Sequence, residues 1–376
     1  MDYRLIPKTG QKVSTVGVGG TSLHSIDEDL GLRIVSRALE SGVNMIDLTV
    51  ESPNVFPVVR KALKGQRERA LLGLHLGLTF LKDGQYKRTR DVSIVRRGFE
   101  KQLAELGTDY ADFAYIHYVD ELADVETIFS SGTFDLALKL KKEGRIRQLG
   151  FSSHKTEICR RLLATKEIDI FMFSVNPAYD LNPVANNPMN EDWSDQNNLR
   201  VIKDRSELYR QAESEGVPIT VMKPFAAGRL LDERSSPFKR AMTVPQLVQY
   251  CLDRPAVVTC LAGLAAESDL NELLAYYDST PAQRDYSIIS RLTLEDLRGQ
   301  CVYCNHCLPC PARIDIASVH KFLDLALAGD QMAKNHYLAL KNQAGACQEC
   351  GSCEDNCPFQ VPVREKMKGA LKLFGR

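Results

Sequence analysis

The sequence predicts a closed (β/α)8 barrel, a TIM barrel of the α/β class, followed by a small and mostly helical domain. Short apolar runs alternate eight times with longer amphipathic runs before residue 280, which is typical of this barrel. Eight of the eleven cysteines lie in the last quarter of the chain. We therefore expect a barrel over residues 1–280 and a connector with a cysteine-rich domain over residues 281–376.

Each barrel strand is predicted from a short apolar run. The predicted strands are residues 13–18, 43–48, 70–76, 112–117, 147–152, 168–175, 218–222 and 257–261. A helix after the first strand is predicted to begin at the capping box Ser25-x-x-Glu28 and to end at Gly42. A later helix carries apolar residues within 92–106 and is predicted to end at Gly107.

A doubly wound parallel sheet is the alternative arrangement for alternating strands and helices. Such a sheet has a glycine-rich nucleotide-binding loop after its first strand. The corresponding stretch here, Gly17-Val-Gly19-Gly20, lacks the third glycine. The barrel is therefore the preferred prediction.

Charge and hydropathy argue against two classes of partner. The 376 residues include 48 basic and 48 acidic side chains, so there is no electrostatic case for nucleic acid or for an anionic membrane. No apolar run approaches the roughly 18 residues of a membrane span. The chain begins without an apolar signal core. We expect a cytoplasmic protein in which Cys159, Cys251 and Cys260 are core thiols.

The cysteines of the last quarter form two runs with the spacing of iron-sulfur ligands. The runs are Cys301-x2-Cys304-x2-Cys307-x2-Cys310-Pro and Cys347-x2-Cys350-x2-Cys353-x3-Cys357-Pro. Three thiolates of such a run bind one cluster, and the fourth binds the other cluster. The sequence thus predicts two [4Fe-4S] clusters that exchange one ligand. The first takes Cys301, Cys304, Cys307 and Cys357, and the second takes Cys347, Cys350, Cys353 and Cys310.

Zinc and disulfide bonds are the alternatives for these cysteines. A zinc site takes four ligands, usually from two C-x2-C pairs, so eight cysteines would over-supply it. Disulfides are typical of short secreted chains. In one departure from the bacterial ferredoxin pattern, only Leu308 and Pro309 precede Cys310, where three residues are usual. This spacing leaves open whether Cys310 ligates less well and whether the second cluster is labile.

The 36 residues between the two runs carry a helical period, with apolar positions within 319–326 and 337–340. This part resembles the helical type of ferredoxin domain, in which helices separate the cysteine runs and the clusters pass single electrons. Before it, residues 276–300 are predicted to form a polar connector that ends in a helix leading to Cys301.

Motifs spread over nearly the whole chain resemble the aldo-keto reductase family. They are Tyr3-Arg4 with Lys8-Thr-Gly10, Gly42-Val-Asn44-Met-Ile46-Asp47, Leu103-x-x-Leu106-Gly-Thr108-Asp109-Tyr110-x-Asp112 with His117, and Gly144-Arg-Ile146-Arg147-x-x-Gly150-Phe-Ser152. The sequence resembles in particular the branch that carries a C-terminal iron-sulfur domain. The resemblance implies an oxidoreductase whose site lies at the barrel mouth.

The catalytic tetrad of that family is an Asp, a Tyr, a Lys and a His, and the Tyr protonates the carbonyl oxygen as hydride arrives from NADPH. Here Asp47 matches the Asp and His117 matches the His. Ser52 stands at the position of the Tyr, and His75 at that of the Lys. A Ser hydroxyl is too weak an acid to replace a phenol, whose pKa is about 10. The tetrad is therefore degenerate.

The resemblance also implies a nucleotide or substrate pocket beside Ser152, Lys223 and Gly228. Met222 stands where many members stack a Tyr on nicotinamide. Residues 263–273 have alanines and a leucine where Ser, Arg or Asn would hold the adenosine phosphate. Binding of NADP(H) is therefore doubtful.

The barrel mouth keeps residues that can manage protons. If both histidines point inward, His75 and His117 beside Asp47 form an acid-base group whose ordinary pKa of about 6.5 suits neutral pH. The alternative is structural, with the histidines in the core and Asp47 bound to backbone. Residues 176–200 are polar and rich in Asn and Pro. They form either a lid over the mouth or a solvated surface loop.

Three functions are compatible with these features. The first is an iron-sulfur oxidoreductase of aldo-keto reductase type that relays electrons through two [4Fe-4S] clusters to or from a substrate or cofactor at the mouth. Its partners would be a small molecule and a redox protein. The second is a non-catalytic electron-transfer or scaffold subunit with a decayed barrel. The third is NADPH-dependent carbonyl reduction, which Ser52 and His75 weaken.

Overall fold

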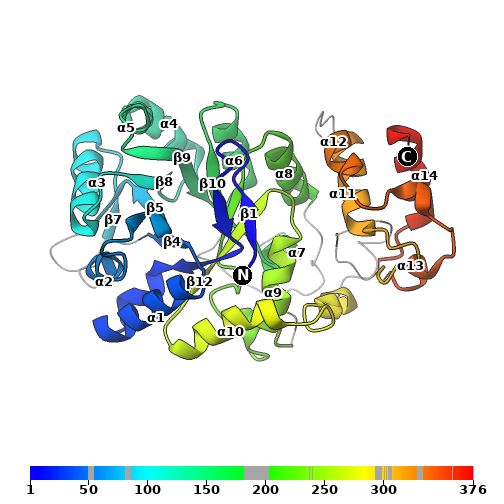
Figure 1. Ribbon diagram of the computed structural model, residues 1–376. Helices are drawn as coiled ribbons and strands as arrows, with labels where there is room; N and C mark the ends of the chain where they lie inside the picture. Colours follow the sequence, from blue (N-terminus) through cyan, green and yellow to red (C-terminus); the bar gives the residue numbers. More distant parts are fainter. Residues whose placement is uncertain are drawn as a thin grey trace.

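The structure is a computed structural model, and Figure 1 shows a barrel with a smaller helical unit beside it at the C-terminal end of the chain. The described residues are 1–49, 55–80, 86–181, 203–236, 238, 240–292, 299, 301, 303, 307–327, 333–357 and 359–375. Two residues with a predicted role, Ser52 and Cys304, lie outside them. Most of the predicted lid, residues 182–200, lies outside them as well.

Eight parallel strands close into a barrel, which confirms the predicted fold class for this part of the chain. They are β3 (Val16–Gly19), β4 (Met45–Leu48), β5 (Leu71–Leu76), β8 (Ala111–Ile116), β9 (Ile146–Ser153), β10 (Ile170–Ser174), β11 (Ile219–Met222) and β12 (Val257–Gly263). Their order around the barrel is β10-β11-β12-β3-β4-β5-β8-β9. Each corresponds to one predicted apolar run, because strands covered on both faces are apolar throughout.

The first predicted strand is divided between two elements. β1 (Tyr3–Leu5) and β2 (Lys12–Ser14) form an antiparallel hairpin, and β3 enters the barrel only at Val16. Ile6 and Val13 of this hairpin are buried with the interior side chains Met45 and Phe113. The hairpin therefore covers the N-terminal end of the barrel. A second hairpin joins β6 (Leu78–Phe80) to β7 (Tyr86–Arg88).

Helices cover the outside of the barrel. They are α1 (Glu28–Glu40), α2 (Val55–Ala62), α3 (Val92–Leu106), α4 (Leu122–Ser130), α5 (Thr133–Lys142), α6 (Thr156–Leu163), α7 (Pro177–Leu181), α8 (Lys203–Ser214), α9 (Val244–Leu252) and α10 (Glu267–Asp278). The predicted end of α3 is confirmed by Gly107, whose φ of 67° suits a left-handed cap. The predicted capping box at Ser25 is wrong. Asp27 caps α1 instead, and its carboxylate accepts the Leu30 N–H at 2.8 Å.

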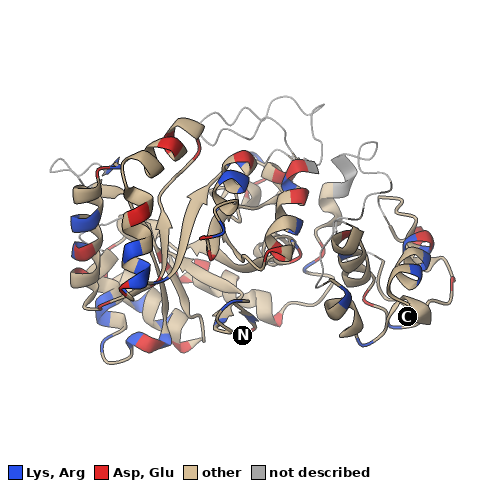
Figure 2. Cartoon of the chain, turned by 90° about the horizontal axis from the view of Figure 1, so that it is seen from above, with Lys and Arg blue, Asp and Glu red and all other residues tan. Residues whose placement is uncertain are grey.

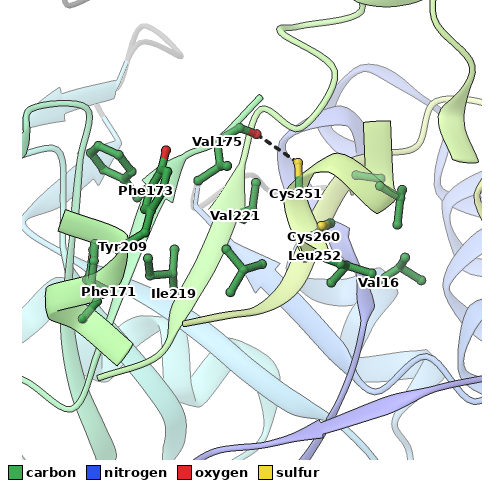
Figure 3. Close-up of a cluster of buried hydrophobic side chains, with 14 of the residues drawn as sticks. Val16, Phe171, Phe173, Val175, Tyr209, Ile219, Val221, Cys251, Leu252 and Cys260 are labelled. Carbon is green, nitrogen blue, oxygen red and sulfur yellow. Dashed lines mark hydrogen bonds between the residues drawn. The ribbon is translucent and has the colours of Figure 1, made fainter. Parts of the chain in front are cut away.

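The main core lies between the strands and the helices. Figure 3 shows part of it, where Cys251 of α9 points toward β10 and donates to the Val175 carbonyl at 3.1 Å. Cys159, Cys251 and Cys260 are each 0% exposed, which confirms that they are core thiols. Burial of each Val, Leu, Ile or Phe side chain of this core contributes about 1.5–3 kcal/mol to the free energy of folding. A second cluster fills the barrel interior and ends at Tyr115 and Met172, just below the mouth.

The cysteine-rich unit, residues 299–375, contains α11 (Ile316–Leu327), α12 (Ala333–Leu338), α13 (Ser352–Asp355) and α14 (Val363–Phe374). It contacts the barrel beside α8, as Figure 1 shows. Lys321 of α11 pairs with Glu213 at the C-terminal end of α8, with 2.5 Å between Nζ and Oε1. The hydroxyl of Tyr286 lies 3.4 Å from the Tyr303 carbonyl. These contacts attach the first cysteine run to the barrel.

The outer surface carries both signs of charge. In Figure 2, the helices around the barrel carry positions coloured for Lys and Arg interspersed with positions coloured for Asp and Glu. Within the described ranges, no helix is long and apolar enough to cross a membrane.

Candidate functional site

The C-terminal ends of β4, β5 and β8 bring three side chains into contact. Asp47 lies beside Gly73 in the β4–β5 pairing, and His75 follows two residues later on the same face. Nε2 of His75 is 3.1 Å from Oδ1 of Asp47, and Nδ1 of His75 is 3.0 Å from Nδ1 of His117. Asp47 and His75 are 3% and 1% exposed. The three residues predicted to be catalytic therefore form one hydrogen-bonded row.

The row implies one arrangement of protons. An ionised Asp47 only accepts, so His75 donates its Nε2–H and keeps a lone pair on Nδ1. His117 must then donate its Nδ1–H to His75, which leaves the lone pair on its own Nε2. A proton taken up at Nε2 of His117 can pass along the row, and the resulting imidazolium of His75 lies against the Asp47 carboxylate.

Neighbouring groups hold this row in place. Oδ2 of Asp47 accepts the Thr49 hydroxyl at 2.7 Å, and the carbonyl of His117 accepts Arg90 at 2.7 Å. Arg90 also donates to both carboxylate oxygens of Asp124, at 2.9 and 2.7 Å. Because these partners bind the carboxylate and the backbone, the rings keep their orientation without losing the free nitrogen.

The pKa of His117 lies well below its ordinary value. Burial is the largest cause, and the neighbours His75, Arg90, Arg88 and His154 lower it further. His117 is therefore a neutral imidazole at pH 7, which suits a proton acceptor.

Two features shape the floor of the mouth. A Cβ at Gly73 would come within 3.0 Å of Oδ1 of Asp47, so glycine gives the carboxylate its space. The ring of Tyr115 lies 5.3 Å from that of His75, and its hydroxyl reaches Thr220 at 3.2 Å. Burial raises the pKa of Tyr115 far above its ordinary value. Tyr115 is therefore an apolar floor and does not replace the missing acidic tyrosine.

The residues predicted to bind a cofactor lie around the same mouth. Ser152 is 4% exposed at the end of β9, and its hydroxyl accepts the Tyr118 N–H at 2.8 Å. Lys223 follows β11 with a φ of 54°, and Gly228 has a φ of 88°. The carbonyl of Lys223 accepts the Asn176 amide at 2.8 Å. Left-handed backbone at a non-glycine residue costs energy and is often found beside binding sites.

The region predicted to meet the adenosine phosphate does not fit an anion. A helix N-terminus binds phosphate through its free N–H groups. At α10, the N–H groups of Ala265 and Ala266 both donate to Oδ2 of Asp269, at 2.8 and 3.0 Å. Glu267 adds a second carboxylate, which pairs with Arg33 at 2.9 Å. Two carboxylates, one of them paired with Arg33, therefore lie at the N-terminus of α10.

Four cysteines of the cysteine-rich unit line one cavity. They are Cys310 of the first run and Cys347, Cys350 and Cys353 of the second. The cavity contains about 410 Å³ of space, part of it open to solvent, and its other walls include Ile314, Val363 and Met367. This set of four contains the fourth cysteine of one run and the first three of the other.

The two runs have the same backbone shape. Tyr303 and Glu349 occupy equivalent positions, and their φ values are 58° and 53°. Arg313 and Gln360, three residues after the last cysteine of each run, have φ values of 53° and 49°. Each donates its N–H to the carbonyl of that last cysteine, at 2.8 and 3.2 Å. At these described positions the two runs therefore share one backbone conformation, despite the missing residue before Cys310.

The start of the first run lies next to the end of the second. The N–H of Gly299 donates to the carbonyl of Phe359 at 2.8 Å. Gly299 precedes Cys301 by two residues, and Phe359 follows Cys357 by two. Cys301 and Cys357 are both half-buried, whereas Cys307 is buried. The backbone thus brings together the two runs at the place predicted for the first cluster.

Several sulfur atoms accept backbone hydrogen bonds. The N–H groups of Glu349 and Val361 lie 3.4 and 3.5 Å from Sγ of Cys347 and Cys357. The backbone of Ser352 is the first cause of a lowered pKa at Cys350. Among the described side chains, no three of His, Cys, Asp or Glu are close enough to hold one metal ion. A [4Fe-4S] cluster binds each sulfur to a different iron, so its ligands stand further apart.

The sequence analysis missed one pair of residues at the mouth. Nδ1 of His154 lies 3.0 Å from Oδ2 of Asp120, and the two residues follow β9 and β8. The available signal was position, because His154 lies two residues beyond Ser152, and alternate residues of an extended chain face the same side.

Comparison with known proteins identifies the barrel. The model of the aldo/keto reductase family matches residues 15–284. Aldo-keto reductase YhdN of Bacillus subtilis is 27% identical over 195 residues, which are 50% of this chain and 54% of that protein. L-galactose dehydrogenase of Arabidopsis thaliana is 30% identical over 165 residues, 42% of this chain and 50% of that protein. The chain thus spans about half the length of the curated relatives it matches.

Solved structures show the same fold. The holo form of aldo-keto reductase AKR11C1 from Bacillus halodurans has a TM-score of 0.60 and 23% identity, and the match covers 78% of this chain and 96% of that one. The aldo/keto reductase from Klebsiella pneumoniae in complex with NADP and acetate has a TM-score of 0.56 and 19% identity, with coverage of 78% and 95%. The barrel, the family match and the strand-end Asp47 and His117 lead to one conclusion: the chain belongs to the aldo/keto reductase family.

Proposed function

We propose that the protein is an iron-sulfur oxidoreductase of the aldo-keto reductase type. Electrons would move through two [4Fe-4S] clusters to or from a small molecule at the barrel mouth, and a redox protein would exchange them with the clusters. One observation carries this proposal. The four cysteines assigned to the second cluster come from two different runs, and they line a single cavity.

The residues fit such a cluster in three ways. The cavity walls are mostly apolar, and a cluster is stable where water is limited. Backbone N–H groups point at the sulfur of Cys347 and Cys357, which stabilises thiolates and tunes the potential. The repeated left-handed residues at Tyr303 and Glu349 turn each loop toward its cysteines. Each bound cluster would supply or accept one electron at a time.

At the mouth, the chain's own residues would bind and move protons. Nε2 of His117 would accept a proton from the substrate or return one to it. His75 would share that proton through the Nδ1–Nδ1 contact of 3.0 Å, and Asp47 would stabilise the charge. In this proposal the row takes the place of the family's tyrosine as the group that transfers the proton. Proton transfer by imidazoles does not require a phenol with a pKa near 10.

One observation favours the alternative of a non-catalytic electron-transfer or scaffold subunit. The cysteine-rich unit contacts the C-terminal end of α8 through Glu213. The helices of this barrel are antiparallel to its strands, so the C-terminal end of α8 lies at the end of the barrel opposite the mouth.

A buried row of side chains nevertheless joins the two places. The rings of Tyr286 and Tyr250 meet edge to face, with 5.2 Å between their centroids, and the Tyr250 hydroxyl donates to Asp180 at 2.9 Å. Arg205 pairs with Asp180 at 2.8 Å and donates to the carbonyl of Ser174, at the mouth end of β10. These four side chains would connect the clusters to the mouth through the protein interior and not through solvent. A scaffold subunit would not need such a connection.

Anaerobic purification with iron and sulfide analysis tests the proposal. We expect about eight iron and eight sulfide ions per chain, and an EPR signal of reduced [4Fe-4S] clusters. Zinc in place of iron, or an iron content near zero in protein prepared without oxygen, would contradict the proposal.

A further inference from the structure

A second histidine and carboxylate pair lies at the mouth, separate from the Asp47 row. Oδ2 of Asp120 is 3.0 Å from Nδ1 of His154. The other oxygen, Oδ1, accepts the backbone N–H of His154 at 2.8 Å and the hydroxyl of Ser153 at 3.0 Å. With three hydrogen bonds, Asp120 fixes both the backbone and the ring of His154.

This arrangement leaves the far nitrogen of His154 without a partner. An ionised Asp120 accepts the Nδ1–H, so Nε2 carries the lone pair. His154 is 6% exposed, and within the described part of the chain Nε2 is buried and makes no hydrogen bond. A buried polar atom without a partner costs stability, so such an atom in a native structure calls for an explanation. A ligand that binds there would supply the missing partner.

The place of His154 connects it to the mouth. It lies two residues after Ser152 on the same side of the extended chain. The ring of Tyr118 separates it from His117, with centroid distances of 5.6 Å to His154 and 6.2 Å to His117. Lys223, at the end of β11, is close enough to act on the charge of His154. His154 therefore lies above the mouth, between the ends of β8, β9 and β11.

Both imidazoles at the mouth are neutral at rest. Burial is the first cause that lowers the pKa of His154, and Lys223 and Arg205 lower it further, while Asp120 opposes them. His117 has a lowered pKa for a similar reason. The mouth thus offers two nitrogen lone pairs, each backed by its own carboxylate.

The number of proton carriers follows from how electrons arrive. A carbonyl group becomes an alcohol when it gains two electrons and two protons, with one C–H and one O–H bond formed as the C=O π bond breaks. A hydride brings both electrons and one hydrogen, so the protein supplies one proton. Single electrons bring no hydrogen, so two protons are needed, one for each new bond, and an imidazole that delivers one must first take it up from solvent at Nε2. Two reduced clusters hold the two electrons that this reaction consumes.

We propose that His154 is a second acid-base group of the mouth, beside His117. Its neutral Nε2 accepts the hydroxyl of an alcohol substrate, and its protonated Nε2 donates to the corresponding carbonyl compound. The inference rests on the proposed function, because only single-electron chemistry needs two proton carriers. In the reverse direction the two imidazoles take up the protons and the clusters take one electron each.

The first test uses the holoprotein and needs no turnover. We expect 15N NMR of the labelled histidines to show an unprotonated Nε2 at His154, and its resonance to move when ethanol or propan-2-ol is added, because an alcohol can donate its O–H to that nitrogen. D120N should shift the proton from Nδ1 to Nε2, because an amide can donate to Nδ1. A protonated Nε2 in the unaltered protein, or a resonance that neither probe moves, would overturn the assignment. This outcome is independent of the iron content, which tests the proposed function separately.

The second test follows the chemistry with reduced methyl viologen as electron donor and a panel of small aldehydes and ketones. In D2O the carbinol carbon of the product should carry solvent deuterium. H154Q should lower kcat about 100-fold or more with a small change in KM. H336Q removes an exposed histidine of α12 and should keep full activity. Equal rates for H154Q and the unaltered protein, protium at the carbinol carbon, or no turnover of the panel by iron-loaded protein would refute the proposal.

Discussion

The hydroxyl of Tyr286 lies 2.8 Å from Oδ2 of Asp253 and 3.4 Å from the carbonyl of Tyr303. Tyr286 belongs to the connector, and Tyr303 lies between the first two cysteines of the first run. Arg254 donates to the same hydroxyl at 3.2 Å. One buried phenol thus joins a charged pair of the barrel to the loop that would hold the first cluster.

The variant Tyr286→Phe should loosen this loop. Loss of the hydroxyl leaves the half-buried Asp253 and the buried Arg254 each with one partner fewer, which costs about 1–3 kcal/mol of unfolding free energy. Hydrogen exchange should rise around Tyr303. Tyr277→Phe is the matched control, since its hydroxyl bonds Thr15 at 2.8 Å. It should lower stability without changing exchange in the cysteine loop, and equal exchange in both variants would contradict the link.

Ligand exchange between the runs predicts a crossed effect. Cys310→Ala should damage the cluster of the second run, and Cys357→Ala that of the first, so each variant should keep about four of eight irons. Iron analysis and EPR of the remaining cluster distinguish the two. Cys159→Ala, which removes a core thiol, should keep all the iron. If Cys310→Ala instead removes the cluster of its own run, the assignment is wrong.

The carboxylates at α10 predict weak binding of NADPH. Fluorescence titration of the unaltered protein should show little binding, and turnover of simple aldehydes with NADPH should be negligible. Glu267→Arg combined with Asp269→Ser removes two negative charges and frees the N–H groups of residues 265 and 266. NADPH affinity should then rise about tenfold or more. Tight binding by the unaltered protein would show that the nucleotide avoids this helix.

A buried histidine makes the cysteine-rich unit sensitive to acid. His320 is 0% exposed, and burial lowers its pKa to about 4, with Lys366 adding to the effect. The unfolded chain protonates this group near pH 6.5, so below that value the unfolded state binds more protons. The free energy of unfolding should therefore fall as the pH drops from about 6.5 to about 4, by on the order of 3 kcal/mol.

His320→Phe tests this pH dependence because a phenyl ring does not titrate. The stability difference between the variant and the unaltered protein should grow in favour of the variant between about pH 7 and about pH 5. Urea unfolding followed by fluorescence measures it. His336→Phe, at an exposed position of α12, should show no such growth. A difference that stays constant with pH would mean that His320 has the same pKa in the folded and the unfolded chain, so that burial does not lower it.

The barrel could be predicted because its strands are buried on both faces and read as apolar runs. The convergence of Asp47, His75 and His117 followed from the rule that strand ends meet at one mouth. Two finer features could not be predicted. Ser25 and Asp27 are both good helix caps, and only the turn at Gly20–Ser25 decides for Asp27. The position of His154 two residues beyond Ser152 was a signal, but its pairing with Asp120 depends on the loop after β8, whose course local pattern does not determine.

The hairpin β1–β2 gives the protein a single entrance. Since Ile6 and Val13 close the N-terminal end, in the described part of the chain small molecules reach the interior only from the mouth. A nicotinamide cofactor would occupy that entrance together with its substrate, and each would restrict the other's departure. In the proposed function electrons would arrive through the barrel wall, so one small molecule would occupy the entrance and the shape of the entrance could be matched to that molecule alone.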